Sequence, residues 1–259
     1  MPLPLSRSQL DKLGKRLAAG VGPPSPEDRA LLQSVLAAYA VVLDEVVGEL
    51  RDLGFEPTSR VKTEDVLIEK LRRHAQRGSS MGLKGMQDIA GARIVVDGGR
   101  GNQDDAVHTI MERFAAKDRV PRSIDRRSSP SVGYRAVHVI VWIETLPVEV
   151  QVRTRYQDTW AQLMEAMGDV WGRGVRYGEG PDQPSRVMGG GDIPRELVWS
   201  TALRMSDLIA SLETTAEQAA EIAALAPSMQ VQVDGLTQLH EDLRNFLEGW
   251  KRIISEERE

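Results

Sequence analysis

A short stretch near the middle of the chain could place chemically active groups in a row on one face of a strand. Residues 148–153 alternate between valine and polar side chains, and this period of two predicts a β-strand with one face in a core. The other face then carries Glu149, Gln151 and Arg153. The acid and the arginine lie about 13 Å apart on such a strand, at roughly 3.3 Å per residue. This face could hold a metal ion at one end and a phosphate at the other. The alternative is an ordinary solvated face.

A second predicted strand, residues 89–96, carries one charged residue in an otherwise apolar run. Arg93 lies in the middle of this run, where a cation needs a partner such as a carboxylate or a ligand phosphate. Asp88 precedes the strand, and Asp97 follows it. Asp97 is interpreted as a turn residue because two glycines come directly after it.

Charge is unevenly distributed along a chain whose formal net charge is −5. Residues 113–135 contain seven basic and two acidic side chains, whereas residues 201–259 contain five basic and eleven acidic ones. A basic block within an acidic protein indicates a local site for an anion rather than a general surface for polyanions. The candidates for an anion rim in this block are Arg119, Arg122, Arg126 and Arg127.

Four short groups of residues occur in order between about residues 55 and 165. They are Arg60, Lys62 and Lys70; Asp88, Gly91 and Arg93; Gly133, Tyr134, Arg135 and His138; and Glu149, Gln151, Arg153 and Thr154. In this order and spacing they resemble the synthetase domain of the RelA/SpoT family, which includes the small alarmone synthetases. One group alone is weak evidence, but four on the expected strand and helix contexts are specific. The resemblance covers less than half of the chain.

The resemblance implies an ATP:nucleotide 3′-pyrophosphotransferase of the GTP pyrophosphokinase type. Such an enzyme transfers the β,γ-pyrophosphate of ATP to the 3′-hydroxyl of GDP or GTP, making (p)ppGpp-type alarmones, and AMP leaves. Negative charge at the β-phosphorus has to be offset by Mg²⁺ and cationic side chains. The resemblance assigns Asp88 to the metal, whereas Glu149 either shares the metal or takes the proton from the attacking hydroxyl.

The same resemblance divides the other site residues between the two nucleotides. The contacts that it implies for ATP are Arg60, Lys62, Lys70 and Arg93; the alternative for the lysines is solvated charge on a helix. On the acceptor side, Tyr134 stacks on the guanine and His138 positions a phosphate or the ribose. These two residues are expected on one face of a strand, four residues apart. The other acceptor contacts are predicted to be Arg126, Arg127, Arg135, Gln151 and Arg153.

Three places depart from the family's pattern and leave the acceptor open. Val66 stands where many members have a serine, Met164 and Glu165 replace a Glu-His pair, and residues 129–132 replace a Pro-Lys pair. Other members of the family act on adenosine nucleotides. Others are toxins that modify the 3′ end of tRNA, and such a toxin would have an antitoxin as a partner.

Two other interpretations are weighed against a synthetase. In one, the chain is a non-catalytic binding module, and intact Asp88, Tyr134 and Glu149 argue against this. The family's hydrolase activity needs a His-Asp metal motif, and none of the four histidines is followed by an aspartate.

The predicted elements make an α/β (α+β) fold, in which a compact mixed β-sheet flanked by helices forms a nucleotidyltransferase-like synthetase core. Strands are expected at residues 89–96, 134–143 and 147–153, and helices at residues 26–53, 64–76, 103–115, 154–171, 196–225 and 233–257. The expected segments are an N-terminal helical segment (1–54), the core (55–172), a flexible loop (173–194) with glycines at 189–191, and a C-terminal helical segment (195–259).

Composition and the last helix set the expectations about partners and location. No cysteine is present, so disulfides, thiolate catalysis and cysteine-based zinc sites are excluded, and a cytoplasmic location fits. No apolar run is expected to span a bilayer, and no membrane partner is predicted. Apolar residues three and four apart in the last helix have the spacing of a helix–helix seam. Packing within the subunit and a homo-oligomer both fit this seam, which consists of Leu236, Leu239, Leu243, Phe246, Trp250 and Ile253.

Overall fold

The computed structural model describes residues 4–20, 22–78, 82–115, 117, 119–182, 186–187, 193–225 and 230–257. The chain divides into two compact units that interleave along the sequence. The first unit comprises Met1–Ile94, Val107–Ser123 and His138–Gln151, and the second comprises Val95–Ala106, Ile124–Val137 and Val152–Glu259. The segment boundaries predicted at residues 54, 172 and 194 stay a prediction.

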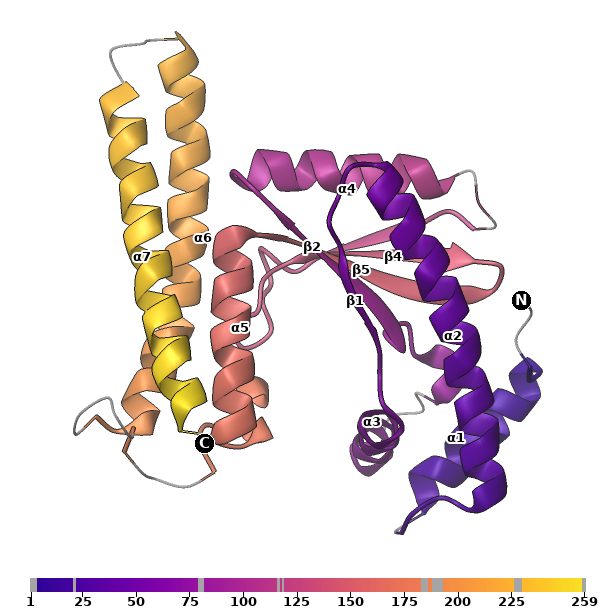
Figure 1. The fold of residues 1–259 in the computed structure, drawn as a ribbon. Helices are drawn as coiled ribbons and strands as arrows, with labels where there is room; N and C mark the ends of the chain where they lie inside the picture. Colours follow the sequence, from indigo (N-terminus) through magenta and orange to yellow (C-terminus); the bar gives the residue numbers. More distant parts are fainter. Residues whose placement is uncertain are drawn as a thin grey trace. The chain divides into compact units, whose positions relative to one another are not determined.

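A five-stranded sheet has the strand order β1-β2-β5-β4-β3 (Figure 1). Its strands are β1 (Thr58–Val61), β2 (Ala90–Val96), β3 (Arg122–Asp125), β4 (Val137–Ile143) and β5 (Leu146–Thr154). The predicted fold class is confirmed, and the three inner strands lie where the apolar patterns predicted them. Strands β1 and β3 were not predicted, because each has only four residues and carries mostly exposed polar side chains.

Strand β5 shows the alternation that its sequence predicts. Val148, Val150 and Val152 are fully buried, whereas Glu149 and Gln151 between them are only partly buried. A link of two residues joins β4 to β5, which are neighbours in the sheet. Strand β5 therefore presents polar groups on one face and buries its valines on the other.

The first unit contains the helices α1 (Arg7–Ala19), α2 (Pro26–Asp52) and α3 (Glu64–Gln76) and the short 3-10 helix η1 (Leu83–Gly85). Helix α2 begins as predicted, because the Ser25 side chain accepts a hydrogen bond from the backbone N–H of Asp28. Helix α1 was not predicted, although Ser6 and Gln9 form a capping box that is visible in the sequence. Helix α1 packs against both α2 and α3. Helix α4 (Arg100–Ala115) has residues in both units.

Helix α2 is long and apolar enough to cross a bilayer by length and composition alone, contrary to the expectation from the sequence. The core helix of a globular unit meets the same test. The buried face of α2 consists of Leu32, Val35, Ala38, Tyr39, Val42, Leu43, Val46, Val47 and Leu50. The helix therefore supplies core to the first unit.

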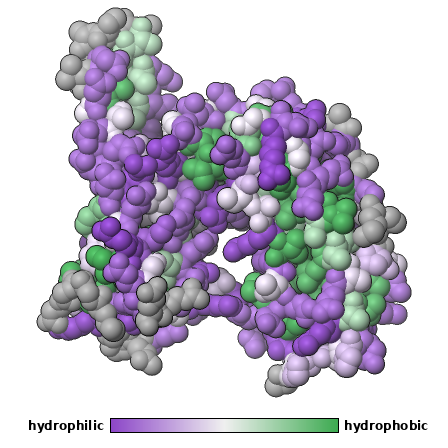
Figure 2. All heavy atoms as spheres, in the orientation of Figure 1, coloured by the Kyte–Doolittle hydropathy of each residue, from purple (hydrophilic) through white to green (hydrophobic). Residues whose placement is uncertain are grey.

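The second unit contains the helices α5 (Arg155–Val170), η2 (Arg173–Tyr177), α6 (Arg195–Leu225) and α7 (Gln230–Glu256). Helices α6 and α7 lie side by side, and both contact α5 (Figure 1). Their shared core includes Trp160, Met167, Ile209 and Leu247. The visible face of the α6–α7 pair is largely hydrophilic, with small hydrophobic patches (Figure 2).

The seam predicted on α7 packs partly within the subunit. Four of its residues are buried in the core of the second unit or pack against it, namely Leu236, Leu243, Trp250 and Ile253. Leu239 and Phe246 are 48% and 47% exposed. A homo-oligomer through these helices stays a prediction. The glycines at 189–191, within the predicted flexible loop, lie outside the described residues.

Candidate active site

Asp88 lies between two lysines in the first unit. Its Oδ2 accepts a hydrogen bond from Lys62 Nζ at 3.0 Å and another from Lys70 Nζ. Lys62 directly follows β1 and Lys70 lies on α3, so separate elements supply the cluster. Burial alone would raise the pKa of Asp88, but the two ammonium groups outweigh it, and the net pKa is lowered. Residues from two of the motif groups thus form one cluster, in which Asp88 is charged at neutral pH.

Glu149 forms the second part of this unit's polar cluster. Its Oε1 lies 3.0 Å from His138 Nδ1, and its Oε2 accepts a hydrogen bond of 2.8 Å from Gln151. Burial would raise the pKa of Glu149, but the hydrogen bond and charge of His138 outweigh it, and the net pKa is lowered. The negative charge of Asp88 acts in the opposite direction, which means that the two carboxylates are within electrostatic range. Asp88, just before β2, and Glu149, on the neighbouring β5, therefore belong to one polar region of the first unit.

Gly91 allows the strands that carry these acids to approach closely. A Cβ at this position would lie 3.3 Å from the backbone oxygen of Glu149, which is tighter than an ordinary contact. Strand β2, which follows Asp88, neighbours β5, which carries Glu149. The glycine in the second motif thus has a packing reason that depends on its missing side chain.

Arg60 and Arg93 lie on one face of the sheet. Strands β1 and β2 are antiparallel, with Thr58 opposite Arg93 and Arg60 opposite Gly91. Residues directly opposite each other, and residues two apart on one strand, share a face. The residues of β2 on the other face, such as Ala92 and Ile94, are buried. The two arginines predicted to contact ATP therefore lie on the same, more open face.

The donor set fits Mg²⁺ that is shared with a phosphate ligand. Within the described residues there is no group of three or more His, Cys, Asp or Glu side chains that could hold a metal ion. Mg²⁺ needs only one or two carboxylates when waters and substrate phosphates complete its shell. Both side-chain hydrogen bonds that Asp88 accepts from described residues go to Oδ2. The rival acid, Asp97, is exposed and pairs with Arg155, which agrees with its interpretation as a turn residue.

Tyr134 belongs to the second unit and does not lie on a strand. Strand β4 begins at Val137, so the prediction that Tyr134 and His138 share a strand face is wrong. Residues 131–135 instead form a turn, in which the backbone N–H of Tyr134 donates to Ser131 O at 3.0 Å. Val132 and Gly133 have φ values of 51° and 80°, in the left-handed region. This backbone overrides the strand propensity of the valine and tyrosine.

Arg153 supports Tyr134 from the end of β5. Its guanidinium lies 5.0 Å from the centre of the Tyr134 ring, and it donates to the Tyr134 hydroxyl at 3.1 Å. A second bond of 2.9 Å goes to Asp158. Burial would lower the pKa of Arg153, but these two partners outweigh it, and the net pKa is raised. Arg153 was predicted on an open polar face, whereas the structure buries it.

The other predicted arginines differ in their ion pairs and in their exposure. Arg127 forms ion pairs of 2.7 Å and 2.8 Å with Asp125 and Asp104. Arg135 pairs with Asp207 at 2.6 Å and donates to Ser206 Oγ at 3.1 Å. The side chain of Arg126 is exposed.

The two arginines that the sequence analysis added to an anion rim have partners in the first unit. Arg119 lies 4.3 Å from the centre of the Trp142 ring. Arg122 donates to Gln87 at 2.8 Å. Neither of these contacts uses a carboxylate.

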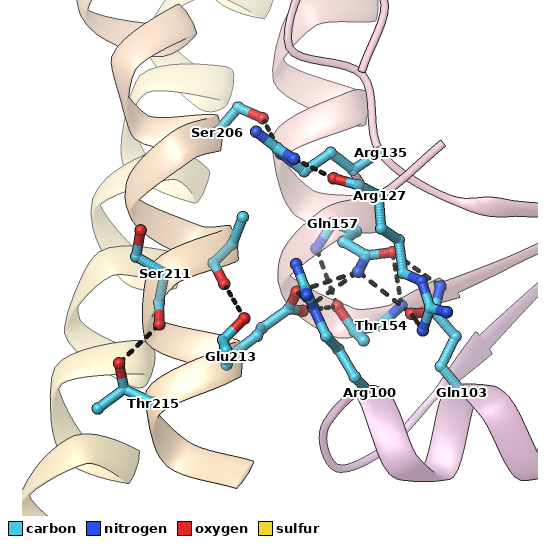
Figure 3. A network of polar contacts seen from close by, with 12 residues as sticks. Arg100, Gln103, Arg127, Arg135, Thr154, Gln157, Ser206, Ser211, Glu213 and Thr215 are labelled. Atoms are coloured by element: carbon cyan, nitrogen blue, oxygen red, sulfur yellow. Dashed lines mark hydrogen bonds and ion pairs between the residues drawn. The ribbon is translucent and has the colours of Figure 1, made fainter. Parts of the chain in front are cut away.

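A buried polar network in the second unit was missed by the sequence analysis (Figure 3). Glu213 on α6 is only 1% exposed and accepts hydrogen bonds from Thr154 Oγ1 and from Gln157 Nε2 at 3.1 Å. Gln103 Nε2 donates to Gln157 Oε1 at 2.9 Å. Only Thr154 belongs to a motif group, and no motif marks Gln103, Gln157 or Glu213. One signal was available, because Ser206 and Glu213 stand seven residues apart on the same helical face as the apolar Ile209.

Comparisons with known proteins agree with this architecture. The family described as "Region found in RelA / SpoT proteins" matches residues 59–167. An uncharacterised protein of Mycobacterium bovis and one of Mycobacterium tuberculosis are each 35% identical to the chain over 199 residues, which is 75% of this chain and 68% of the relative. Among solved structures, small alarmone synthetase 1 from Bacillus subtilis, bound to its product pppGpp, is similar in fold. The TM-score is 0.52 at 24% identity, covering 76% of this chain and 98% of that chain.

Proposed function

The chain belongs to the RelA/SpoT family, and from this premise we propose that it is an Mg²⁺-dependent pyrophosphokinase that makes (p)ppGpp-type alarmones. The 3′-hydroxyl oxygen of GDP or GTP attacks the β-phosphorus of ATP. The bond between the β-phosphorus and the oxygen bridging to the α-phosphorus breaks, AMP leaves with that oxygen, and the hydroxyl proton is released. The observation that carries the proposal is the cluster of Asp88 with Lys62 and Lys70, which lies just before β2, the neighbour of the strand that carries Glu149.

The chain's own residues would bind the metal ion and the ATP phosphates separately. Asp88 and Glu149 would hold Mg²⁺, which when bound offsets charge on the transferring phosphates. Lys62 and Lys70 would bind ATP phosphates, since each ammonium has three donors, of which Asp88 takes two from Lys62 and one from Lys70. Arg60 and Arg93 extend this cationic surface on one face of the sheet.

The lowered pKa of Glu149 bears on the two roles left open for it. A general base works best with a pKa near the working pH, and a carboxylate whose pKa is lowered is a weaker proton acceptor. The same shift keeps the carboxylate charged and suited to a cation. We therefore assign Glu149 to the metal and to orienting His138, whose Nδ1 it contacts at 3.0 Å.

On the acceptor side, Tyr134 would stack on the base, as the family resemblance implies. The Arg153 contact fixes its ring, and stacking on a base contributes about 1–3 kcal/mol. A relative's structure holds pppGpp, which supports a guanosine acceptor here. Because the proposed substrates are cytoplasmic nucleotides, we place the activity in the cytoplasm.

The experiment is transfer of label from [γ-³²P]ATP in the presence of Mg²⁺. GDP, GTP, adenosine nucleotides and tRNA are offered in separate reactions. Label on the 3′ position of GDP or GTP supports the proposal, and no transfer to any nucleotide contradicts it. Asp88→Asn is the matched variant, expected to abolish transfer while keeping the side chain's shape.

The 3′ end of tRNA is the second candidate acceptor, favoured by the arginine-rich segment that departs from the family pattern. Two of its arginines, Arg127 and Arg135, are paired with aspartates, which weakens this candidate. Label on intact tRNA that is lost when the terminal adenosine is removed would establish it. A search for an antitoxin partner follows only from that result.

A further inference from the structure

The turn that presents Tyr134 is held by helix α6, which carries none of the family's motifs. Ser206 Oγ donates a hydrogen bond to Gly133 O and accepts one of 3.1 Å from Arg135 Nε. One buried hydroxyl thus joins the residues directly before and after Tyr134. Arg135 also donates to the carbonyl of Arg127 (Figure 3). Asp207, the next residue on α6, pairs with Arg135 as well.

This turn has a backbone that its own residues do not favour. Val132 is β-branched yet has a φ of 51°. Such a conformation persists only where the surroundings determine it. At Gly133 a Cβ would lie 2.8 Å from the Trp160 ring and 3.2 Å from Ser206 Cβ, so α5 and α6 close directly over the turn. The helix contacts therefore select the shape of residues 131–135.

A second polar contact fixes the register of α6. Glu213 lies two helical turns beyond Ser206 and binds Thr154 and Gln157, at the junction of β5 and α5. Arg100 Nε approaches the same carboxylate at 3.5 Å. Two buried polar anchors seven residues apart set both the rotation and the translation of the helix, because a shift of one residue would leave both unpaired. Thr154 also follows Arg153, the residue that holds the Tyr134 hydroxyl.

We infer that α6 is a positioning element for the acceptor nucleotide: Ser206 sets the turn that presents Tyr134, and Glu213 sets the register of α6. This inference rests on the proposed function for the identity of the ligand. It gives the C-terminal helical segment a role in substrate selection beyond packing. Ser206 acts through the turn and touches no reacting atom.

The test compares Ser206→Ala with Ser211→Ala. Ser211 lies on the same helix, its side chain is exposed, and its backbone carbonyl accepts from Thr215 whatever the side chain is. Steady-state kinetics with Mg²⁺ give KM for the acceptor and for ATP separately. We expect Ser206→Ala to raise the KM for GDP or GTP about tenfold, the equivalent of roughly 1.4 kcal/mol for a lost hydrogen bond. KM for ATP should stay within about twofold, and Ser211→Ala should match the wild type.

Hydrogen exchange of the protein without nucleotides provides a readout independent of catalysis. Amides of residues 131–136 should exchange faster in Ser206→Ala, while those of β2 should be unchanged. An unchanged acceptor KM with unchanged exchange overturns the inference. So does an equal rise in both KM values with a lowered Tm, since that is the signature of general destabilisation. If the wild type transfers label to no nucleotide, the proposed function fails by itself. Hydrogen exchange of the turn residues then decides whether α6 holds the turn.

Discussion

In the first unit Asp88 and Glu149 keep 25% and 15% of their side-chain surface exposed, whereas in the second unit Arg153 and Glu213 keep 2% and 1%. The first cluster is built around Asp88 and Glu149, and the second around Arg153 and Glu213. Both contain carboxylates and cations at hydrogen-bonding distance. The partners of these partly exposed acids are two lysines, a histidine and a glutamine, and each lysine ammonium carries three donors. The partners of the buried groups are neighbouring side chains, namely Asp158 and Tyr134 for Arg153, and Thr154 and Gln157 for Glu213.

This difference separates residues that meet a ligand from residues that hold a shape. A charge that must exchange a protein partner for a phosphate or a metal has to remain reachable, and its ion pair has to be incomplete. A sealed charge is tolerated only when it is fully paired, because an unpaired buried charge is costly. Replacing a residue of the first cluster should therefore remove activity, and replacing one of the second should mainly remove stability or geometry.

The largest effect is expected from Glu149→Gln. The amide keeps the shape of the side chain but has no charge for Mg²⁺, so we expect transfer to fall by about 10³-fold or more with the fold intact. Initial rates with labelled ATP and the Tm from circular dichroism measure both. The matched control is Glu112→Gln, because Glu112 forms an exposed pair with His108 at 3.1 Å, similar in chemistry to the His138 pair. Normal turnover in Glu149→Gln would remove this carboxylate from the mechanism.

Arg153→Ala is expected mainly to lower the stability of the second unit. Removing the guanidinium leaves Asp158 buried without its cation, and breaking such a pair costs about 3–5 kcal/mol of unfolding free energy. Urea denaturation followed by tryptophan fluorescence reports on it, since four of the five tryptophans lie in the second unit. The exposed Arg126→Ala should shift the midpoint little. Equal midpoints for the two variants would mean that Arg153 does not stabilise the unit.

The first cluster was largely predictable from the sequence, and the reason is local. Glu149 stands out because β5 alternates strictly, and Arg93 because it interrupts an apolar strand. Asp88, Lys62 and Lys70 were chosen by their place in the motifs. Each of these signals lies within a few residues of the side chain that it marks. The structure adds that the lysines bind Asp88 directly.

The second cluster was not predictable in the same way, because its contacts are distant in sequence. Ser206 lies 71 residues from Arg135, and Glu213 lies 59 from Thr154. Periodicity assigns such residues to a helical face without naming what that face touches. Tyr134 was misplaced for a different reason: a left-handed valine is rare enough that propensity favours a strand.

A smaller effect on the first cluster is expected from Gly91→Ala. The new Cβ would meet the Glu149 backbone oxygen at 3.3 Å, so β2 and β5 must separate by a few tenths of an ångström. The two carboxylates then lose their best spacing for one ion, and we expect transfer to fall about tenfold. Raising the Mg²⁺ concentration should recover part of the rate. Gly99→Ala, where nothing lies within 4 Å of an added Cβ, is the control.

The smallest effect concerns the pH dependence of the unfolding free energy, which distinguishes partly exposed charges from buried ones. The pKa values of Asp88 and Glu149 are lowered below 3.8 and 4.5 in the folded protein. Groups of this kind bind protons more tightly in the unfolded chain, so their contribution to stability is present above the unfolded pKa values. This contribution is lost as the pH falls through the pKa values of the two groups in the folded protein. The wild type should therefore lose stability as the pH falls below about 4.5, the unfolded value for a glutamate.

Asp88→Asn should show a shallower loss of stability over the same range, because its side chain no longer titrates. Urea midpoints measured at several pH values between neutral and acid give both slopes. The exposed Glu112→Gln should keep the wild-type slope. If Asp88→Asn and the wild type have the same slope, the lysines do not hold the Asp88 carboxylate in the charged form. The cluster would then have no preformed site for a cation.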